Sequence, residues 1–292
     1  MKVLVTGAGG QLGHEVVRVF AGLGHEVLKP SRQAMDFMVP DQVAEAVRSS
    51  HADWIVNCAA YTQVDRAESE PEAAFTVNRD SAGRLAQAVA ETGGRLVHIS
   101  TDFVFDGRQS VPYREDDLPN PLGVYGHSKL QGEQAVLAAL PAATVLRTAW
   151  VYGIHGHNFV KTMLRVAAAG KPLRVVNDQV GTPTWAADIA AAIAALFHCD
   201  AAGVFHYTNA GQTSWHGFSA AILAEAARLG FELKTQAVEP IPTTDYPTPA
   251  TRPAYSVLDT HKIRACLPGP VPAWRDSLVN MLKELHSCAD CW

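Results

Sequence analysis

The residues best suited to chemistry lie between positions 100 and 129. The run Ser100-Thr101-Asp102 follows an apolar stretch, and Tyr125-Gly126-His127-Ser128-Lys129 begins a segment with helical character. Tyr125 and Lys129 stand at i and i+4, so a helix places both on one face, where the ammonium can lower the pKa of the phenol. Such a phenol can give a proton to a carbonyl oxygen while a hydride reaches the carbon, and the Thr101 hydroxyl can hold that oxygen. Alone, Tyr-x-x-x-Lys equally fits a solvated helix face, so its interpretation depends on the surrounding elements.

The beginning of the chain predicts a cofactor site for that chemistry. Residues 2–6 form a β-branched and leucine run typical of a buried strand, and residues 16–23 have the apolar period of a helix. Between them, Gly7 permits a tight turn, Gly10 lets the backbone approach a ligand, and Gly13 lets helix and strand pack closely. A strand, a glycine turn and a helix N-terminus in this order predict a binding site for a dinucleotide pyrophosphate. The turn reads Gly7-Ala8-Gly9-Gly10-Gln11-Leu12-Gly13.

The second predicted strand, residues 25–29, bears on the choice of cofactor. An NAD enzyme of this type usually ends that strand with an acidic residue for the ribose hydroxyls. Here Lys29, Ser31 and Arg32 can instead accept a 2′-phosphate, so the sequence favours NADPH over NADH. Asp36 and Phe37 follow where the edge of the adenine is expected. The alternative to a 2′-phosphate site is that Lys29, Ser31 and Arg32 belong to a solvated loop.

Alternating strands and helices predict the fold class. We expect an α/β fold with a doubly wound parallel (Rossmann) sheet. Small residues at the end of the third strand leave room for a cofactor across the sheet edge. Asp41 is expected to cap the helix that precedes this strand. The remaining expected strands cover residues 54–60, 95–100 and 144–147, and the expected helices cover 41–50, 68–91 and 125–140.

The alternation loosens after Trp150, which suggests two parts. We expect residues 1–150 to form an NAD(P)-binding domain, with a returning helix near 185–198, and residues 151–292 to form mainly a smaller substrate-binding lobe. Lys161 and Arg252 in the second part are candidates for contacts with substrate phosphates, with plain surface charges as the alternative.

The totals limit the partners and the compartment. The 292 residues carry a formal net charge of −5, which disfavours nucleic acid as a partner. The sequence has no apolar span of transmembrane length and opens on a strand rather than a signal peptide, so we expect a cytoplasmic protein with no membrane partner.

Neither the cysteines nor the histidines predict a metal site. An odd count of five cysteines argues against a disulfide framework, and Cys288 and Cys291 lack a second pair to complete a zinc site. His155 and His157 flank Gly156 with no third ligand in view. We therefore interpret them as loop histidines.

Together, these motifs resemble the extended short-chain dehydrogenase/reductase superfamily and, more closely, the dTDP-4-dehydrorhamnose reductase family. The similar stretches cover nearly the whole chain. They include residues 57–65, 67–71, 146–152, 158–163, 177–184 and 246–253.

The resemblance implies reduction, by NAD(P)H, of the 4-keto group of dTDP-4-dehydro-β-L-rhamnose, a nucleotide sugar. It makes Tyr125 the proton donor, Lys129 the residue that holds the nicotinamide ribose and tunes Tyr125, and Thr101 the residue that orients the keto sugar. Trp150 would pack on the sugar. The candidate cofactor-binding residues are Gly7, Gly10, Gln11, Leu12, Gly13, Arg32, Asp36, Phe37, Ala60, Tyr61, Thr62, Asn78, Ile99, Tyr125 and Lys129. The candidate substrate-binding residues are Thr101, Asp102, Trp150, Asn158, Lys161 and Arg252.

The sequence departs from the family pattern in ways that keep alternatives open. Some members dimerise through Mg²⁺ held by three glutamates; Glu15 and Glu284 match two of them, but the third falls at Ala187. A homodimer is compatible with the sequence, but the magnesium set is incomplete. Phe103 stands where dehydratases of this fold have a glutamate, which counts against dehydration. Other nucleotide-sugar reductases or epimerases, and a non-catalytic NADP-binding regulatory subunit, remain alternatives.

Overall fold

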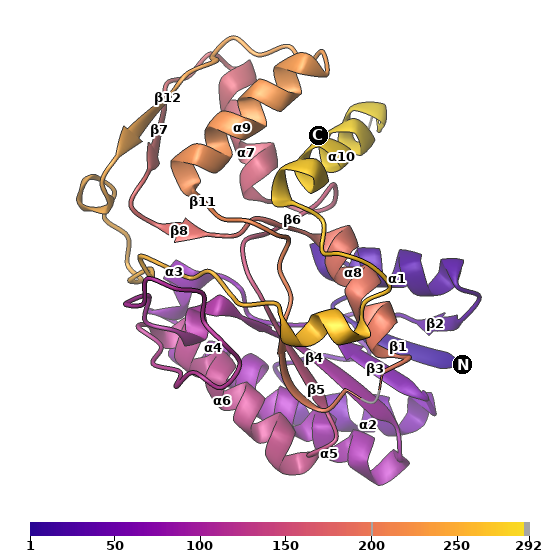
Figure 1. The fold of residues 1–292 in the computed structure, drawn as a ribbon. Helices are drawn as coiled ribbons and strands as arrows, with labels where there is room; N and C mark the ends of the chain where they lie inside the picture. The colour runs from indigo at the N-terminus through magenta and orange to yellow at the C-terminus, as the bar shows by residue number, and fades with distance from the viewer. Residues whose placement is uncertain (200, 289–292) are drawn as a thin grey trace.

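A sheet of six parallel strands forms the centre of the molecule (Figure 1). The computed structural model describes residues 1–199 and 201–288. The strand order is β10-β5-β4-β3-β1-β2, so the predicted doubly wound sheet is confirmed, with β10 as a strand that the sequence pattern did not predict. The strands are β1 (Lys2–Thr6), β2 (Glu26–Leu28), β3 (Trp54–Asn57), β4 (Arg95–Thr101), β5 (Thr144–Thr148) and β10 (Gly203–His206).

Helices cover both faces of this sheet. Side chains alternate along a strand, so Val3 and Val5 of β1 enter the core on one face while Leu4 enters the core on the other. The first face is covered by α1 (Gln11–Gly22) and α8 (Ala186–Leu196). The second face is covered by α2 (Pro40–Ser50), α5 (Ala82–Thr92) and α6 (Val124–Ala139). We call the sheet with these helices the sheet lobe.

Two expected helix features differ in the structure. Helix α2 begins at Pro40 with Val39 as its N-cap, so Asp41 is not the cap; proline suits a first helical position because its φ is already fixed. The helix expected over 68–91 is divided by a π-helix, which packs against α6 where Gly132 lets the carbonyl of Asn78 approach. Its segments are α4 (Pro71–Phe75), the π-helix η1 (Thr76–Ser81) and α5, and a separate short helix, α3 (Val64–Ala67), precedes them.

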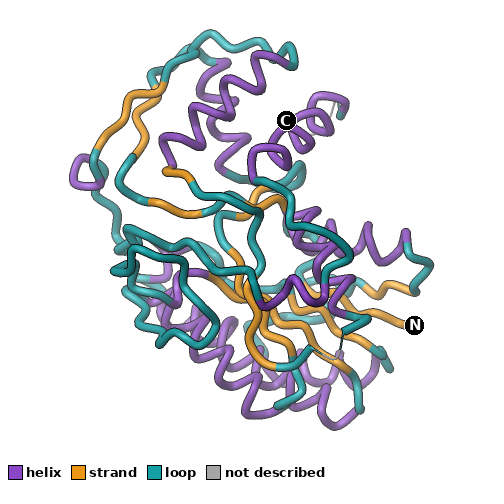
Figure 2. Tube along the Cα trace, in the orientation of Figure 1, coloured by secondary structure: helices purple, strands orange, loops and turns teal. Residues whose placement is uncertain are grey.

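A second hydrophobic core lies beyond the carboxyl ends of the strands, in the upper half of Figure 1. It is built by α7 (Phe159–Ala168), α9 (Trp215–Arg228) and α10 (Trp274–Ser287), with Phe218, Leu278 and Leu282 among its fully buried side chains. We call these three helices and the short strands around them the helical lobe. Figure 2 shows those strands between longer loops. They are β6 (Val151–Tyr152), β7 (Leu173–Val176), β8 (Val180–Gly181), β9 (Thr184–Trp185), β11 (Thr213–Ser214) and β12 (Val238–Ile241), and the 3₁₀ turns are η2 (Asp102–Val104), η3 (Thr243–Asp245) and η4 (Lys262–Cys266).

A disulfide between Cys199 and Cys266 joins segments distant in sequence. Cys199, after α8, is bonded to Cys266 at the end of η4, with Cα atoms 5.7 Å apart. The expectation that the cysteines are unpaired is wrong for this pair, because an odd count says nothing about which residues the fold brings together. Cys291 lies outside the described residues. No described helix is both long and apolar enough to cross a bilayer.

Candidate active site

The sheet reverses its winding between β1 and β3. From β1 the chain crosses to β2 on one side and then returns to β3 on the other. Ligands of doubly wound sheets bind at the carboxyl ends of the strands at such a point. The glycine turn follows β1, and Ala60 and Tyr61 follow β3. Gly7 has φ +63°, and a Cβ there would lie 2.8 Å from the Ala59 nitrogen, so only glycine fits between the two loops.

The glycine turn has the shape that a pyrophosphate requires. A Cβ on Gly13 would overlap the Gly7 carbonyl, so α1 packs directly on the turn. A Cβ on Gly9 would meet nothing within 4 Å, so that side of the turn is open. Gly10 is the N-cap of α1, and the first turn of the helix carries no acidic residue. The N–H groups of this turn therefore fit the anionic part of a dinucleotide.

The adenosine end of this site lies beyond β2. Ser31, Arg32, Gln33 and Asp36 line a hollow of about 490 Å³. The Arg32 side chain is 84% exposed, and its Nε lies 4.0 Å from the Asp36 carboxylate. The Phe37 side chain packs among the core side chains between the sheet and α2.

Tyr125 and Thr101 meet at the carboxyl end of β4. Burial raises the pKa of Tyr125 to about 12; a hydrogen bond with the Thr101 hydroxyl opposes the shift, and the charge of Asp102 adds to it. Thr101 also donates to the Asp102 carboxylate at 3.1 Å. Burial raises the pKa of Asp102 to about 6, against hydrogen bonds from Ser256 and Thr101. Because the pKa of Tyr125 is about 12, its phenol keeps its proton at neutral pH.

Lys129 lies below this pair, one helical turn from Tyr125. Its Nζ donates to the Ile99 carbonyl at 2.6 Å. Burial lowers the pKa of Lys129 to about 8, while Glu133 and Cys58 oppose that shift. The expected net fall in the pKa of Tyr125 is not found, because desolvation determines the direction of the shift in the protein without ligands. The ammonium of Lys129 is held there by the Ile99 carbonyl.

A buried ion pair supports Lys129 from behind. Glu133 accepts two hydrogen bonds from Arg147, at 2.6 and 2.9 Å, and one from the Ser100 hydroxyl at 2.5 Å. Both side chains of the pair are less than 5% exposed. Glu133 is four residues after Lys129, so its charge lies on the same helix face and favours the ammonium form.

Comparisons with known proteins identify the family of this chain. A family model described as the RmlD substrate binding domain matches residues 1–287. The dTDP-4-dehydrorhamnose reductase of Burkholderia thailandensis is 44% identical, with 98% of this chain and 100% of that protein covered. The enzyme of the same name from Escherichia coli K12 is 41% identical, with 98% and 99% covered. The chain belongs to the dTDP-4-dehydrorhamnose reductase family. The family resemblance found in the sequence is thus confirmed.

Solved structures of the same family have the same fold. The Bacillus anthracis dTDP-4-dehydrorhamnose reductase in complex with NADP superposes with a TM-score of 0.91 at 35% identity, covering 97% of this chain and 99% of that chain. A UDP-glucose 4-epimerase from Thermus thermophilus superposes with a TM-score of 0.83 at 22% identity, which shows a shared fold alone.

Three candidate ligand-binding residues have their polar groups engaged within the protein. The amide of Asn78 pairs with the backbone of Tyr61 and donates to Ser128, so it positions the loop after β3. Asn158 caps α7 and donates to the side chain of Gln11 at 3.0 Å, which joins the two lobes. Arg252 pairs with both oxygens of Asp65, at 2.7 and 3.0 Å.

Trp150 lies where the two lobes meet. It has φ +46°, which is rare for a bulky residue. Its ring stacks on Trp215 at 3.6 Å between centroids, and a Cβ on Gly181 would lie 2.5 Å from the ring. The ring is thus held between α9 and β8, and only its remaining edge can meet a sugar. Lys161 donates to the Ile154 carbonyl at 3.1 Å.

Sequence reasoning missed Glu133 and Trp215. The spacing Tyr125-x₃-Lys129-x₃-Glu133 is a local signal that could have found Glu133, since all three lie on one helix face. No local signal pairs Trp215 with Trp150.

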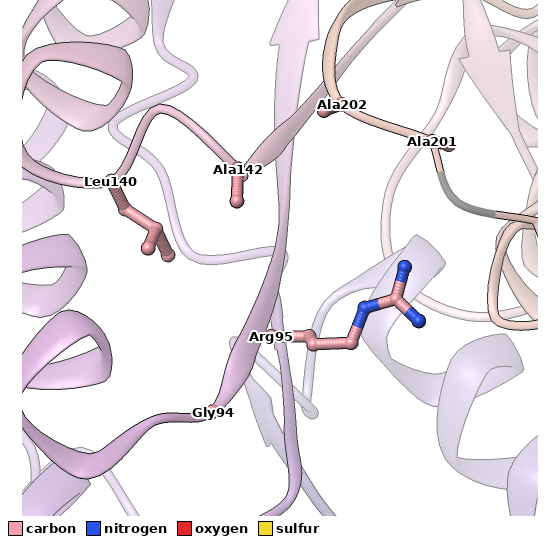
Figure 3. A pocket seen from close by; sticks show the side chains of 6 residues that line it. All are labelled: Gly94, Arg95, Leu140, Ala142, Ala201 and Ala202. Atoms are coloured by element: carbon pink, nitrogen blue, oxygen red, sulfur yellow. The ribbon is translucent and has the colours of Figure 1, made fainter.

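A second hollow, of about 280 Å³, lies at the opposite end of the sheet. Figure 3 shows its lining of Gly94, Arg95, Leu140, Ala142, Ala201 and Ala202 near the amino ends of β4, β5 and β10. Arg95 extends along its side, where it donates to the Cys199 carbonyl and lies over the Trp54 ring. Its lining is otherwise apolar and has no part in the candidate site.

Proposed function

We propose that the chain reduces the 4-keto group of dTDP-4-dehydro-β-L-rhamnose to give dTDP-L-rhamnose, with NADPH as the reductant. The observation that carries the proposal is the contact of Thr101 with Tyr125 beside the buried Lys129, at the same edge of the sheet as the glycine turn. It is supported by relatives named dTDP-4-dehydrorhamnose reductase, one of them in complex with NADP.

Tyr125 acts as the proton donor in this proposal. Its pKa of about 12 keeps the phenol protonated at neutral pH. When bound, the reduced nicotinamide supplies the hydride that the keto carbon accepts. Tyr125 gives its proton to the keto oxygen, so that C=O becomes CH–OH and a tyrosinate is left on the protein. The Thr101 hydroxyl holds the keto oxygen beside the phenol.

Lys129 stabilises the negative charge that forms on Tyr125 and holds the nicotinamide ribose. The Ile99 carbonyl fixes the position of the Lys129 ammonium. The charge of Glu133 opposes the effect of burial, and the pKa of Lys129 is about 8. Most of the lysine is therefore protonated at pH 7, so positive charge is present before the proton leaves the phenol.

The remaining roles follow the geometry of the two lobes. The turn with Gly7, Gly10, Gln11 and Leu12 binds the pyrophosphate, and Arg32 binds the 2′-phosphate. The helical lobe, with Lys161, Arg252 and the free edge of Trp150, binds the nucleotide sugar. Arg252 then exchanges one of its bonds with Asp65 for a phosphate oxygen. A cytoplasmic location and a homodimer belong to the same proposal and rest on the sequence.

Dehydration is disfavoured by the residue after Asp102. The Phe103 ring meets the Tyr125 ring edge-on, with centroids 5.5 Å apart, and has no proton to transfer. Elimination of water needs a further acid and base at this place.

One assay separates the candidate functions. Purified protein is given a panel of nucleotide-linked 4-keto sugars with NADPH or NADH, and the loss of reduced-nicotinamide absorbance is followed. We expect the fastest turnover with dTDP-4-dehydro-β-L-rhamnose and NADPH. Binding of NADPH without turnover on any sugar would favour the regulatory subunit, and release of water from dTDP-glucose would favour a dehydratase.

A further inference from the structure

Three potential metal ligands meet where α1 touches the loop after β6. They are His14 and Glu15 of α1 and His155 of that loop, and one ligand atom from each lies within 4.8 Å of the other two. The two imidazole rings stack with centroids 3.4 Å apart and planes tilted by 34°. Within residues 1–199 and 201–288, no other set of three histidine, cysteine or acidic side chains comes together in this way.

The carboxylate of Glu15 has an unused oxygen. Glu15 is 1% exposed, and its Oε2 accepts hydrogen bonds from Arg18 at 2.6 and 2.7 Å. Its Oε1 is buried with no hydrogen-bond partner among the described residues. Buried carboxylate oxygens are normally satisfied, because leaving one without a donor destabilises the fold. A cation beside Oε1 would satisfy it without displacing Arg18.

The two histidines offer free lone pairs. Neither imidazole makes a side-chain hydrogen bond within the described part of the chain, and the two rings lie in contact. Imidazole is the commonest metal ligand in proteins and binds through the nitrogen that carries no proton, so each ring can supply one ligand atom.

We propose that His14, Glu15 and His155 bind one divalent transition-metal ion of the Zn²⁺ class, with water as a further ligand. Two imidazoles and a carboxylate form a common zinc donor set, whereas Mg²⁺ and Ca²⁺ prefer oxygen ligands throughout. This site goes beyond the reductase activity and does not depend on it.

The site differs from the three-glutamate magnesium set that the resemblance implies. Only Glu15 is common to both. Asp188, next to the missing glutamate, is occupied by Asn209 and Ser277, which donate to its Oδ2 at 2.7 and 2.5 Å. The proposal differs from the interpretation of His155 as a plain loop histidine, which considered no ligand about 140 positions earlier in the chain.

The ion would join the two lobes at the first turns of α1, the helix that follows the glycine turn. The loop of His155 already lies on the start of α1, since Asn158 donates to Gln11 and a Cβ on Gly156 would lie 3.2 Å from the Gln11 side chain. A ligand that bridges α1 and this loop binds the folded state alone, so it raises the unfolding temperature.

Titration of the full chain tests this site. Chelator-treated protein is titrated with Zn²⁺ by calorimetry and with Co²⁺ by absorption spectroscopy, and its unfolding temperature is measured with and without Zn²⁺. We expect one ion per chain and a higher unfolding temperature with Zn²⁺. His155→Asn and His14→Gln should each weaken binding by at least about tenfold, the lower end of what even an outer-shell partner contributes.

His157→Asn is the matched control, because His157 is exposed and outside the cluster although it lies two residues from His155. It should bind Zn²⁺ like the original chain. If either cluster variant is unfolded by circular dichroism, Glu15→Gln replaces it, since the amide keeps the shape of the side chain. Absence of saturable binding, equal binding by all variants, or thiolate-to-cobalt charge-transfer bands that place the ion on cysteines would each overturn the proposal.

Discussion

The two ends of the candidate cofactor site differ in how their charges are held. At the nicotinamide end, Lys129 and Asp102 are 2% exposed. Burial lowers the pKa of Lys129 to about 8 and raises the pKa of Asp102 to about 6. At the adenosine end, Arg32 is 84% exposed and its nearest carboxylate is 4.0 Å away. Charges act strongly where water is excluded and weakly where it is not. The buried end should therefore determine rate and stability, and the exposed end should determine only which nicotinamide is preferred.

Tyr125→Phe tests the buried end most directly. Removing the proton donor should lower kcat by about 10²–10⁴-fold, the usual contribution of a positioned acid, with NADPH affinity unchanged. Steady-state kinetics and a binding titration measure both quantities. Tyr207→Phe is the control, since Tyr207 is also a buried tyrosine of the sheet lobe but lies after β10. Near-normal turnover of Tyr125→Phe would remove Tyr125 from the role of donor.

Glu133→Gln tests the support behind Lys129. The substitution leaves the Arg147 guanidinium buried without its counter-charge, which should lower the free energy of unfolding by about 3–5 kcal/mol. It also removes the main charge that raises the pKa of Lys129, so the alkaline limb of the rate profile should move below pH 8. Urea unfolding and a pH–rate profile measure the two effects. The double variant Glu133→Gln/Arg147→Met should lose less stability than the sum of the single variants; strict additivity would show that the pair is not coupled.

Asp102→Asn should stabilise the protein at neutral pH. The folded pKa of Asp102 is raised from 3.8 to about 6, so the fold favours the protonated form and the charged form destabilises it above pH 6. A shift of this size corresponds to about 2–3 kcal/mol. Asparagine avoids that penalty, so the variant should be more stable at pH 8, and the difference should shrink as the pH falls through 6 and vanish near 4. Unfolding midpoints across this range measure it; a difference that grows toward low pH would have the wrong sign.

Much of the sheet lobe was predictable, because its signals are local. The glycine turn and the alternation of strands and helices indicated the doubly wound sheet, and the spacing of Tyr125 and Lys129 indicated a shared helix face. The direction of the Tyr125 pKa shift was not predictable, since it depends on how completely the surrounding chain excludes water.

Features that depend on long-range partners were not predictable. Arg252 carries the same charge whether it faces solvent or Asp65, and only the fold brings the two together. The strand β10 was missed because its four residues follow a helix in the part of the chain where alternation had ended. His155 gave no sign of His14, because no spacing rule connects residues so far apart in sequence.

Arg32→Ala tests the exposed end and should have the smallest effect. An exposed charge contributes about 0.5–1 kcal/mol, so the Kd for NADPH should rise roughly two- to fivefold while that for NADH stays the same. The effect should weaken as ionic strength rises, since solvent-exposed charges are screened by salt. Arg108→Ala is the matched control, because Arg108 is 81% exposed and 3.9 Å from its own carboxylate partner. Equal weakening of NADPH and NADH would exclude Arg32 from the 2′-phosphate site. A loss for NADPH as large as the catalytic loss in Tyr125→Phe would show that bound cofactor buries this arginine, and the contrast between the two ends would then hold only for the free protein.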